Sequence, residues 1–360
     1  MMLGPILLAL MSFLFTICRA CPDVDFTNNF FAVNITTNST NTLAPRFYSV
    51  PNQRGDGVGL GPWPVTVVDS TNGNQAYIYY CYVDEWAVNN FPPLFDSAFQ
   101  KWYSVLIQSA LRFVPDPECG SDHKCACSDT SRPDTLRISR TDGTSFATVG
   151  YQYRSNRAGR HYLKLNWNNP DDTAGRALKV QEATHELGHV IGLEHEHQRP
   201  DRDNDMDFHC ESMIGYAEAE AKVKKAIEDP RAADLPIPEC TDPDQAKDCM
   251  IKYVCPYPWY ARVYMPIALP YVLGSYFSHR APFEADDAYV DENSIMIYSS
   301  YTAAKVNIRF PDGAVLIGKR DDGTLFEIFQ GGSENPAGGH ISERDEIAVM
   351  RLYPKDIDRS

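Results

Sequence analysis

The sequence is poor in positive charge. Only 33 of its 360 residues are Lys or Arg, against 48 Asp or Glu, and the formal net charge is −15. A chain with this balance repels phosphates, which argues against nucleic acid or an anionic membrane surface as a partner. Hydrophobic residues make up 43% of the chain. That is enough to bury a sizeable core, so a globular protein is expected rather than a disordered one.

Long apolar runs are absent beyond the N-terminus, so the sequence predicts no transmembrane helix and no stable membrane anchor. The apolar stretch 5–17 has the length of the central part of a signal peptide and is too short to span a bilayer comfortably. The residues before it lack Lys and Arg, which leaves a short membrane anchor as the alternative. Cleavage after Ala20 makes residues 1–20 a signal peptide, and the N-glycosylation sequons at Asn34 and Asn38 agree with secretion.

Two ligand-binding motifs are incomplete. The Gly-rich stretch 55–61 has Leu60 where a dinucleotide-binding motif requires its third glycine, so it is interpreted as a linker. The acidic stretch that begins at Asp201 resembles a calcium-binding loop. Met206 and Ser212, however, occupy the positions that require Gly and Glu. Neither a dinucleotide site nor a calcium site is therefore predicted.

Cysteines are plentiful. Of the ten, Cys18 leaves with the signal peptide, and an exported chain is expected to join the other nine in disulfides with one thiol left over. Cys21, at the new terminus, is the expected free thiol. Zinc binding by the CACSDT stretch at 125–130, or by Cys249 and Cys255, is the alternative that an oxidising compartment disfavours.

The order of predicted elements is that of a mixed α/β sheet. Residues 21–62, rich in Asn, Thr, Pro and Gly, are expected to form a loosely structured N-terminal segment. Beyond them, β-forming runs and helix-periodic runs follow one another. Strands are predicted over 75–84 and 161–167, with two more around Asp142 and Gly143 within 134–154; helices are predicted within 93–115, where the helix ends just before Pro115, and over 174–192 and 211–230.

The helix over 174–192 contains two histidines with the spacing of metal ligands. His185 and His189 are four residues apart, so their rings lie one above the other on the helix surface. The apolar residues fall on the opposite side, which predicts that the helix buries one face and presents its histidines to a cleft. Gly192 is expected to end the helix in a left-handed conformation.

The complete pattern is H-E-x-x-H-x-x-G-x-x-H. Gly192 reverses the chain and returns His195 as the third ligand of a tetrahedral zinc ion, which leaves one position open. Glu186 is then placed as general base toward the activated water. Chance would produce the five fixed positions about once in 10⁴–10⁵, so incidental surface histidines are a poor explanation. His197 is a competing third ligand, but its offset does not match the turn.

This elongated motif resembles that of the metzincin zinc peptidases. DENSIMIYSS, at 291–300, is similar to their methionine turn, with Met296 beneath the metal. The resemblance implies an α+β fold of mixed α/β metzincin type. It would comprise a twisted mixed sheet with an active-site helix, a largely irregular C-terminal subdomain and a final helix. Residues 63–355 would form the catalytic domain, with a Cys-containing insertion at about 205–285 that is either a surface elaboration or a substrate-selecting lid.

Within the metzincins, HEHQRPDRD at 195–203 and ISERDEIAVMRLYP at 341–354 resemble the astacins. That resemblance implies one catalytic zinc, a Tyr298 that stabilises the transition state, and a Glu196 that holds the mature N-terminus. Ile297 departs from the histidine of the family's turn. Some astacins block their zinc with a propeptide aspartate, and Asp56 is the candidate here.

The sequence thus predicts a secreted, monomeric zinc endopeptidase acting on proteins or peptides. An extended substrate would pair with the edge strand in 144–152, as the resemblance implies. A secreted metzincin of a non-astacin branch and a non-catalytic zinc-binding scaffold remain open as alternatives. The presence of Glu186 argues against the scaffold.

Overall fold

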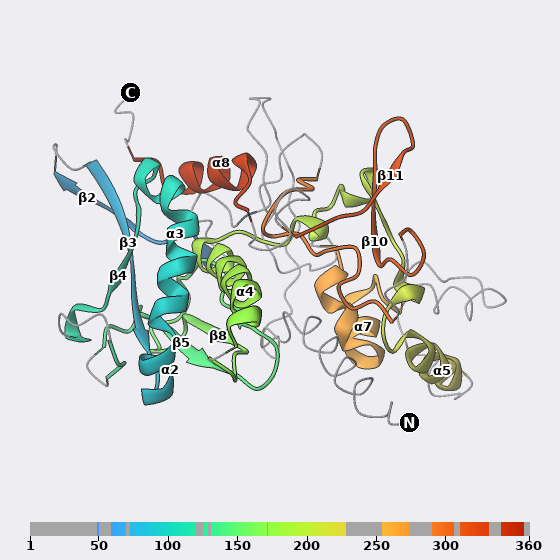
Figure 1. The fold of residues 1–360 in the computed structure, drawn as a ribbon, viewed down its shortest axis with the longest axis horizontal. Coiled ribbons are helices and arrows are strands. Elements are labelled where there is room, and N and C mark those ends of the chain that lie inside the picture. The colour runs from blue at the N-terminus through green and yellow to red at the C-terminus, as the bar shows by residue number, and fades with distance from the viewer. Residues whose placement is uncertain are drawn as a thin grey trace, which may run out of the picture. The chain divides into compact units, whose positions relative to one another are not determined.

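The computed structural model describes Ser49 and residues 59–69, 73–119, 125–128, 131–170, 172–227, 254–273, 290–305, 310–330 and 340–355. The chain divides into two compact units (Figure 1). The sheet unit holds the described residues up to Glu196, then 290–297, then those from Phe329 onward; the second unit holds those within His197–Phe277 and Tyr298–Ile328. The predicted signal peptide, Cys21, Asn34, Asn38 and Asp56 lie outside the described residues.

The sheet unit contains a six-stranded mixed sheet. Its path runs β2 (Val65–Asp69), β3 (Gly73–Tyr82), β5 (Leu136–Arg140), β8 (Tyr162–Leu165) and β6 (Phe146–Ala147), with β4 (Leu111–Pro115) paired to β3 off this path. The pairs β3–β4, β3–β5 and β5–β8 are parallel. The pairs β2–β3 and β6–β8 are antiparallel. Alternate residues of β3 are buried, as the period of two predicts for a strand that covers a core. The mixed sheet confirms the predicted fold class.

Two long helices, α3 (Pro92–Gln108) and α4 (Thr173–Ile191), pack against each other within this unit (Figure 1). Helix α3 follows the short α2 (Glu85–Asn90) and buries Phe95 and Trp102 in the core. The prediction that this helix extends nearly to Pro115 is wrong. It ends at Gln108, and the β-forming residues after Ala110 pair with β3 instead, because strand pairing outweighs a continued helical pattern.

The segment 134–154 contains three short strands, whereas two were predicted. They are β5, β6 and β7 (Tyr151–Gln152), and β7 pairs with β1 (Leu60–Gly61) in a separate two-stranded sheet. The strands on either side of Asp142 and Gly143 do not pair with each other. Strand β8 lies between β5 and β6, so the order in the sequence differs from the order in space.

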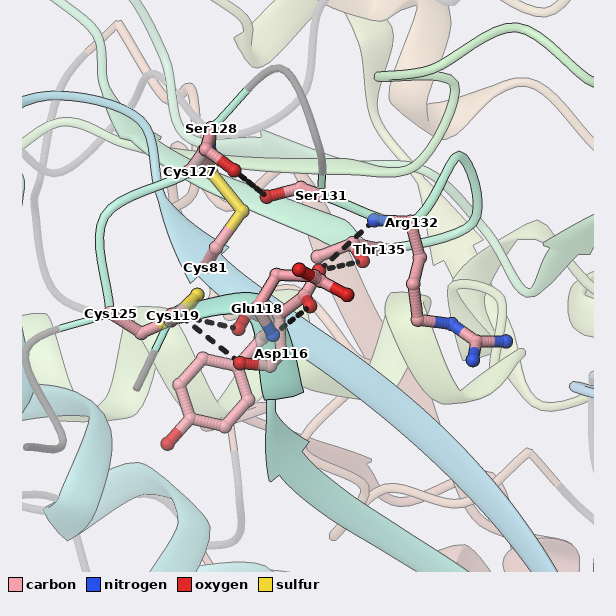
Figure 2. Close-up of a disulfide and its surroundings, with 11 residues drawn as sticks. Cys81, Asp116, Glu118, Cys119, Cys125, Cys127, Ser128, Ser131, Arg132 and Thr135 are labelled. Atoms are coloured by element: carbon pink, nitrogen blue, oxygen red, sulfur yellow. Dashed lines mark hydrogen bonds between the residues drawn. A yellow bond between two sulfur atoms is a disulfide. The ribbon is translucent and has the colours of Figure 1, made fainter. Parts of the chain in front are cut away.

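Disulfides fasten both units. In the sheet unit Cys81 bonds Cys127 across a Cα–Cα distance of 5.0 Å, and Cys119 bonds Cys125 (Figure 2). Beside them the buried carboxylate of Asp116 accepts the backbone N–H of Glu118 at 3.0 Å and that of Arg132 at 3.3 Å. The alternative that CACSDT binds zinc is wrong, because both of its cysteines are disulfide-bonded.

The second unit carries a three-stranded antiparallel sheet of β9 (Met206–Phe208), β10 (Leu316–Lys319) and β11 (Leu325–Phe326). Among its described residues are the helices α5 (Tyr216–Ile227), which confirms the helix predicted over 211–230, and α7 (Pro258–Tyr264). A disulfide joins Cys210 to Cys255, so the alternative of zinc binding by Cys255 is wrong. Within the described residues no helix is both long and apolar enough to cross a membrane. Short 3₁₀ turns cover Pro117–Cys119, Glu196–Gln198, Arg202–Asn204, Cys210–Ser212 and Pro266–Tyr271.

The last helix, α8 (Glu343–Leu352), belongs to the sheet unit and confirms the predicted C-terminal helix. It begins with a capping box. The Ser342 side chain accepts the N–H of Asp345, and the Asp345 carboxylate accepts the N–H of Ser342. Just beyond its end, the Tyr353 hydroxyl donates to the carbonyl of Ile191 at 2.5 Å, which fastens this helix to the end of α4.

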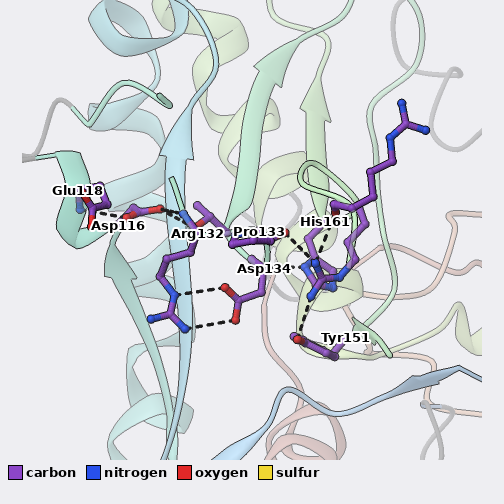
Figure 3. A network of polar contacts seen from close by, with 10 residues as sticks. Asp116, Glu118, Arg132, Pro133, Asp134, Tyr151 and His161 are labelled. Carbon is purple, nitrogen blue, oxygen red and sulfur yellow. Dashed lines mark hydrogen bonds and ion pairs between the residues drawn. The ribbon is translucent and has the colours of Figure 1, made fainter. Parts of the chain in front are cut away.

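A buried histidine links β7 to the residues just before β5 in the sheet unit. His161 Nδ1 lies 3.1 Å from the carbonyl of Asp134, and its Nε2 lies 3.0 Å from the backbone nitrogen of Gln152 (Figure 3). Because the Gln152 N–H must donate, Nε2 accepts, Nδ1 donates, and the ring is neutral. Burial, followed by the charge of Arg160, lowers the pKa of His161 from 6.5 to about 4.

This geometry predicts a loss of stability in mild acid. The unfolded chain takes up the His161 proton near pH 6.5, whereas the folded chain resists it down to about 4. The stabilisation is therefore complete above 6.5 and falls away as pH drops toward 4, by about 3 kcal/mol in total. His161→Gln keeps a donor and an acceptor but does not titrate. Urea unfolding at pH 7.5 and pH 5 is expected to show a smaller pH difference in the variant than in the wild type, and equal differences would refute the assignment.

Candidate metal centre

Helix α4 positions the histidines. It begins at the N-cap Asp172, whose side chain accepts the N–H of Gly175 at 2.9 Å, and it ends at Gly192, whose φ is 121°. At that positive φ a side chain would be strained, so glycine is required for the chain to reverse. The Gly192 N–H closes the last turn onto the carbonyl of His189 at 2.9 Å. Both predicted boundaries of this helix are confirmed.

The three predicted ligands converge. His185 Nε2 and His189 Nε2 each lie 3.1 Å from His195 Nε2. In the described part of the chain, these residues form the one cluster of three or more potential metal ligands, with all ligand atoms within 4.8 Å of one another. A tetrahedral zinc ion with bonds of about 2.0–2.1 Å holds its nitrogens about 3.3 Å apart, which matches this spacing.

The outward ring nitrogens fix the tautomers. His185 Nδ1 lies 2.8 Å from the carbonyl of Ile295, and His189 Nδ1 lies 2.9 Å from the carbonyl of Leu193. Because a carbonyl can only accept, each Nδ1 carries the proton and each Nε2 directs a lone pair at its neighbours. Lone pairs facing one another repel unless a cation lies between them, so the donor set fits Zn²⁺.

The three histidines are almost fully buried, with 1%, 3% and 4% of their surfaces exposed for His185, His189 and His195. The prediction that α4 presents its histidines to a cleft stays a prediction, because low exposure alone does not decide whether a cleft leads to them. Residues 183–191 are buried on every side of the helix.

His197 does not join the cluster and belongs to the second unit. Its Nε2 lies 2.9 Å from the carbonyl of Pro270, and its Nδ1 accepts the N–H of Tyr298 at 3.3 Å. Both ring nitrogens therefore hydrogen-bond to the backbone. The alternative that His197 is the third ligand is wrong.

Glu186 is wholly buried, with 0% exposure. Neither of its carboxylate oxygens has a hydrogen-bond partner among the described residues. Burial, followed by the nearby charge of Glu182, raises the pKa of Glu186 well above its ordinary value. A buried carboxylate without hydrogen bonds lowers the stability of the fold. Groups of this kind are concentrated at functional sites.

The methionine turn lies against α4. Met296 is 1% exposed, and a Cβ built on Gly188 would come within 2.4 Å of its sulfur. The carbonyl of Ile295 accepts from His185, and the carbonyl of Met296 accepts the N–H of Glu196 at 3.2 Å. The turn is thus hydrogen-bonded to the first ligand and to the residue that follows the third.

Asp345 holds this turn from the other side. Its carboxylate accepts the hydroxyl of Ser294 at 2.7 Å and the N–H of Ile295 at 2.9 Å. Burial, followed by the charge of Asp291, raises the pKa of Asp345 to about 7, against hydrogen bonds that lower it. Asp345 was not predicted from the sequence, although its place in the capping-box pattern at Ser342 was a signal that α8 begins there.

The residues after Glu196 in the HEHQRPDRD stretch organise the second unit. Arg199 is fully buried and forms a two-pronged ion pair with Asp201, with both N–O distances 2.9 Å. Arg202 pairs with Asp203 and donates to the carbonyl of Tyr271 at 2.7 Å. This half of the motif is explained by packing and charge pairing within that unit.

The structure thus brings together seven of the predicted site residues in the sheet unit: His185, Glu186, His189, Gly192, His195, Glu196 and Met296. Tyr298 belongs to the second unit, where it is 3% exposed and its ring centroid lies 4.4 Å from that of His197. Gly188 and Asp345 were not predicted as site residues, because their partners in the methionine turn are distant in sequence.

The contact between Gly188 and Met296 leads to a testable prediction. Gly188→Ala adds a methyl group where Met296 Sδ lies, and overpacking is expected to lower the free energy of unfolding by about 1–2 kcal/mol even after alanine's better helix propensity. Urea unfolding measures the effect. Gly143→Ala is the matched control, because its Cβ meets its nearest neighbour at an ordinary 3.5 Å. In a Met296→Ala background the cost of Gly188→Ala should be smaller, and a Gly188→Ala protein as stable as the wild type would contradict the contact.

Residues 82–226 match the family model described as Astacin, a peptidase family, and this range holds α4 and all three zinc ligands. No curated protein matches the chain.

Among solved structures, the chain is similar to high choriolytic enzyme 1, a hatching enzyme zinc-protease from the medaka fish Oryzias latipes. The identity is 14%, with 81% of this chain and 94% of that chain covered and a TM-score of 0.44. Two structures of myroilysin are 15% identical, with TM-scores of 0.40 and 0.37. They cover 82% of this chain in each case, and 100% and 92% of their own. From the match of residues 82–226 to the astacin family, and from the zinc triad inside that range, we conclude that this chain is a zinc metalloendopeptidase with one catalytic zinc ion.

Proposed function

We propose that this protein is a secreted endopeptidase in which Glu186 is the general base of peptide-bond hydrolysis. The proposal rests on the position, the burial and the missing hydrogen bonds of the Glu186 carboxylate. It follows a zinc ligand directly, it is fully buried, and neither of its oxygens has a hydrogen-bond partner among the described residues. A buried carboxylate of this kind is available to a water molecule and to a substrate.

Zinc, when bound by the three histidines, supplies Lewis acidity that lowers the pKa of water toward neutrality and polarises a carbonyl. Glu186 accepts the proton of the attacking water and passes it to the nitrogen of the leaving amine. Burial favours the first of these steps, since it raises the pKa of Glu186 and so strengthens it as a base. Met296 makes no bond to the metal in this proposal and provides an apolar floor under the ligands.

The substrate is proposed to pair in extended form with β6, which ends the strand order of the six-stranded sheet. Two contacts support this role by tying the strand to α4. Ser145, just before β6, donates to Glu182, and the N–H of Gly150, just after it, donates to the carbonyl of His189 at 2.9 Å. A peptide on β6 would therefore lie at a fixed distance from the zinc helix.

Tyr298 is proposed to hydrogen-bond the oxyanion that develops on the scissile carbonyl. Its support is its position two residues after Met296, where the astacin pattern has a tyrosine. Its packing against His197 and Tyr271 also agrees with a purely structural tyrosine, so kinetics must separate the two roles.

Kinetics on casein test these roles. Glu186→Gln is expected to lower kcat by about 10²–10⁴-fold with zinc content unchanged, because the amide keeps the shape and loses the base. Tyr298→Phe is expected to lower kcat by about 10²–10³-fold with KM unchanged. Glu220→Gln, on the surface of α5 beside Lys224, is the control that should leave activity intact.

Two outcomes would count against the proposal. Full activity in Glu186→Gln would remove this residue as the base. A wild-type protein that binds zinc but hydrolyses no casein would favour the alternative of a non-catalytic zinc-binding scaffold.

We further propose that residues 1–20 are a signal peptide, that Asn34 and Asn38 carry glycans, and that the segment 21–62 is removed on activation, with Asp56 blocking the zinc until then. Glu196 would then hold the new N-terminus. Its support is its 5% exposure and its backbone bond to the methionine turn, which place it beside the metal site. A monomer without a membrane anchor is expected.

N-terminal sequencing and mass spectrometry of the protein secreted by expressing cells test these points together. The precursor is expected to begin at Cys21 and to lose mass on enzymatic deglycosylation, and the active form to begin after Asp56. Glu196→Gln should lower the melting temperature of the active form more than that of the precursor. A secreted, active chain that still carries residues 1–58 would contradict both the signal peptide and the switch.

A further inference from the structure

Gln330 lies beside the first zinc ligand, although no motif includes it. Its side-chain nitrogen is 3.0 Å from His185 Nδ1 and 3.2 Å from the carbonyl oxygen of Ile295. The same carbonyl oxygen is 2.8 Å from His185 Nδ1. The three polar atoms therefore form a closed triangle on the side of the ring that faces away from the other two histidines.

The chemistry of the three groups decides which hydrogen bonds exist. His185 Nε2 faces His195, so Nδ1 carries the proton and donates to Ile295. An amide N–H cannot donate to a protonated nitrogen, so Gln330 must donate to the same carbonyl oxygen, which has two lone pairs. The opposite amide orientation would set two acceptor oxygens about 3.2 Å apart with no proton between them. The carbonyl of Ile295 thus accepts from both side chains.

The backbone of Gln330 is fastened to α4 as well. Gln181 Nε2 donates to the carbonyl oxygen of Gln330 at 3.0 Å, and Gln181 is 9% exposed. Gln181 precedes His185 by four residues, so the two side chains are neighbours on one face of the helix. One residue therefore links the zinc helix, the methionine turn and the segment that precedes α8.

We propose that Gln330 is a positioning residue for zinc binding, which acts by holding the Ile295 carbonyl in the place where it orients His185. The proposal rests on the zinc triad and is independent of the roles proposed for Glu186 and Tyr298. Outer partners of a metal ligand set its ring orientation, and their loss weakens metal affinity by about 10–100-fold.

The experiment measures zinc affinity by competition with a chromophoric chelator, together with the visible spectrum of the Co²⁺-loaded protein and the melting temperature of the metal-free protein. Gln330→Met keeps the length of the side chain and removes the donor. It is expected to weaken zinc binding by about tenfold and to shift the Co²⁺ bands, with metal-free melting unchanged. Gln330→Leu also removes the donor, with a shorter apolar side chain, and is expected to weaken zinc binding by a similar factor.

Gln108→Met is the matched control. Gln108 is exposed near the end of α3, where its amide donates to the carbonyl of Ser104 at 3.0 Å, so zinc affinity should not change. Wild-type zinc affinity in both Gln330 variants would overturn the proposal. So would a variant whose metal-free melting temperature falls while zinc affinity and the Co²⁺ bands stay unchanged, because that result describes a purely structural residue. Because zinc affinity is measured without substrate, failure of the peptidase proposal would leave this test intact.

Discussion

Three imidazole nitrogens with lone pairs directed at one another are the constraint on which the rest of the sheet unit depends. At separations of 3.1 Å their repulsion is relieved only by a shared cation. To keep this geometry, each outward Nδ1 must remain protonated. Its hydrogen-bond partner must therefore be a group that can only accept. Backbone carbonyls meet that need because they never donate. The carbonyl of Leu193 comes from the reversed end of α4 and that of Ile295 from the methionine turn, so the metal site requires two segments that are remote in the sequence.

Burying the end of a helix has its own cost, because the last carbonyls of a helix have no partners within it. In α4, aromatic side chains supply the missing donors. Trp63 Nε1 donates to the carbonyl of Val190 at 2.8 Å, and the Tyr353 hydroxyl donates to that of Ile191. Each of these side chains fills the core and satisfies a polar group at the same time. The helix end can therefore be dry, which strengthens every electrostatic interaction near the metal.

The parts of the site that sequence reasoning found are local. The spacing of His185 and His189 lies within one helix, where periodicity decides the outcome. The parts it missed depend on long-range contacts, since Asp345 and Gln330 reach their partners across 51 and 35 residues. The error in the fold has the same origin. The predicted helix continued past Gln108 because the residues beyond it fit a helical period, but β3 offered them a parallel partner. Local propensity sets which residues can form a strand, and the choice of partner is made by the whole sheet.

The length of the HEHQRPDRD motif follows from the way the chain divides. Its first residues serve the metal site, and the division between the two units falls directly after Glu196. From His197 onward the same stretch serves the second unit, through the bond of His197 to Pro270 and the buried ion pair of Arg199. The methionine turn divides in the same way, because Met296 belongs to the sheet unit and Tyr298 to the second unit. Each motif is therefore a junction at which a few adjacent residues satisfy two sets of constraints. A substitution at Glu196 can thus affect the metal site, whereas a substitution at the next residue, His197, can affect the packing of the second unit.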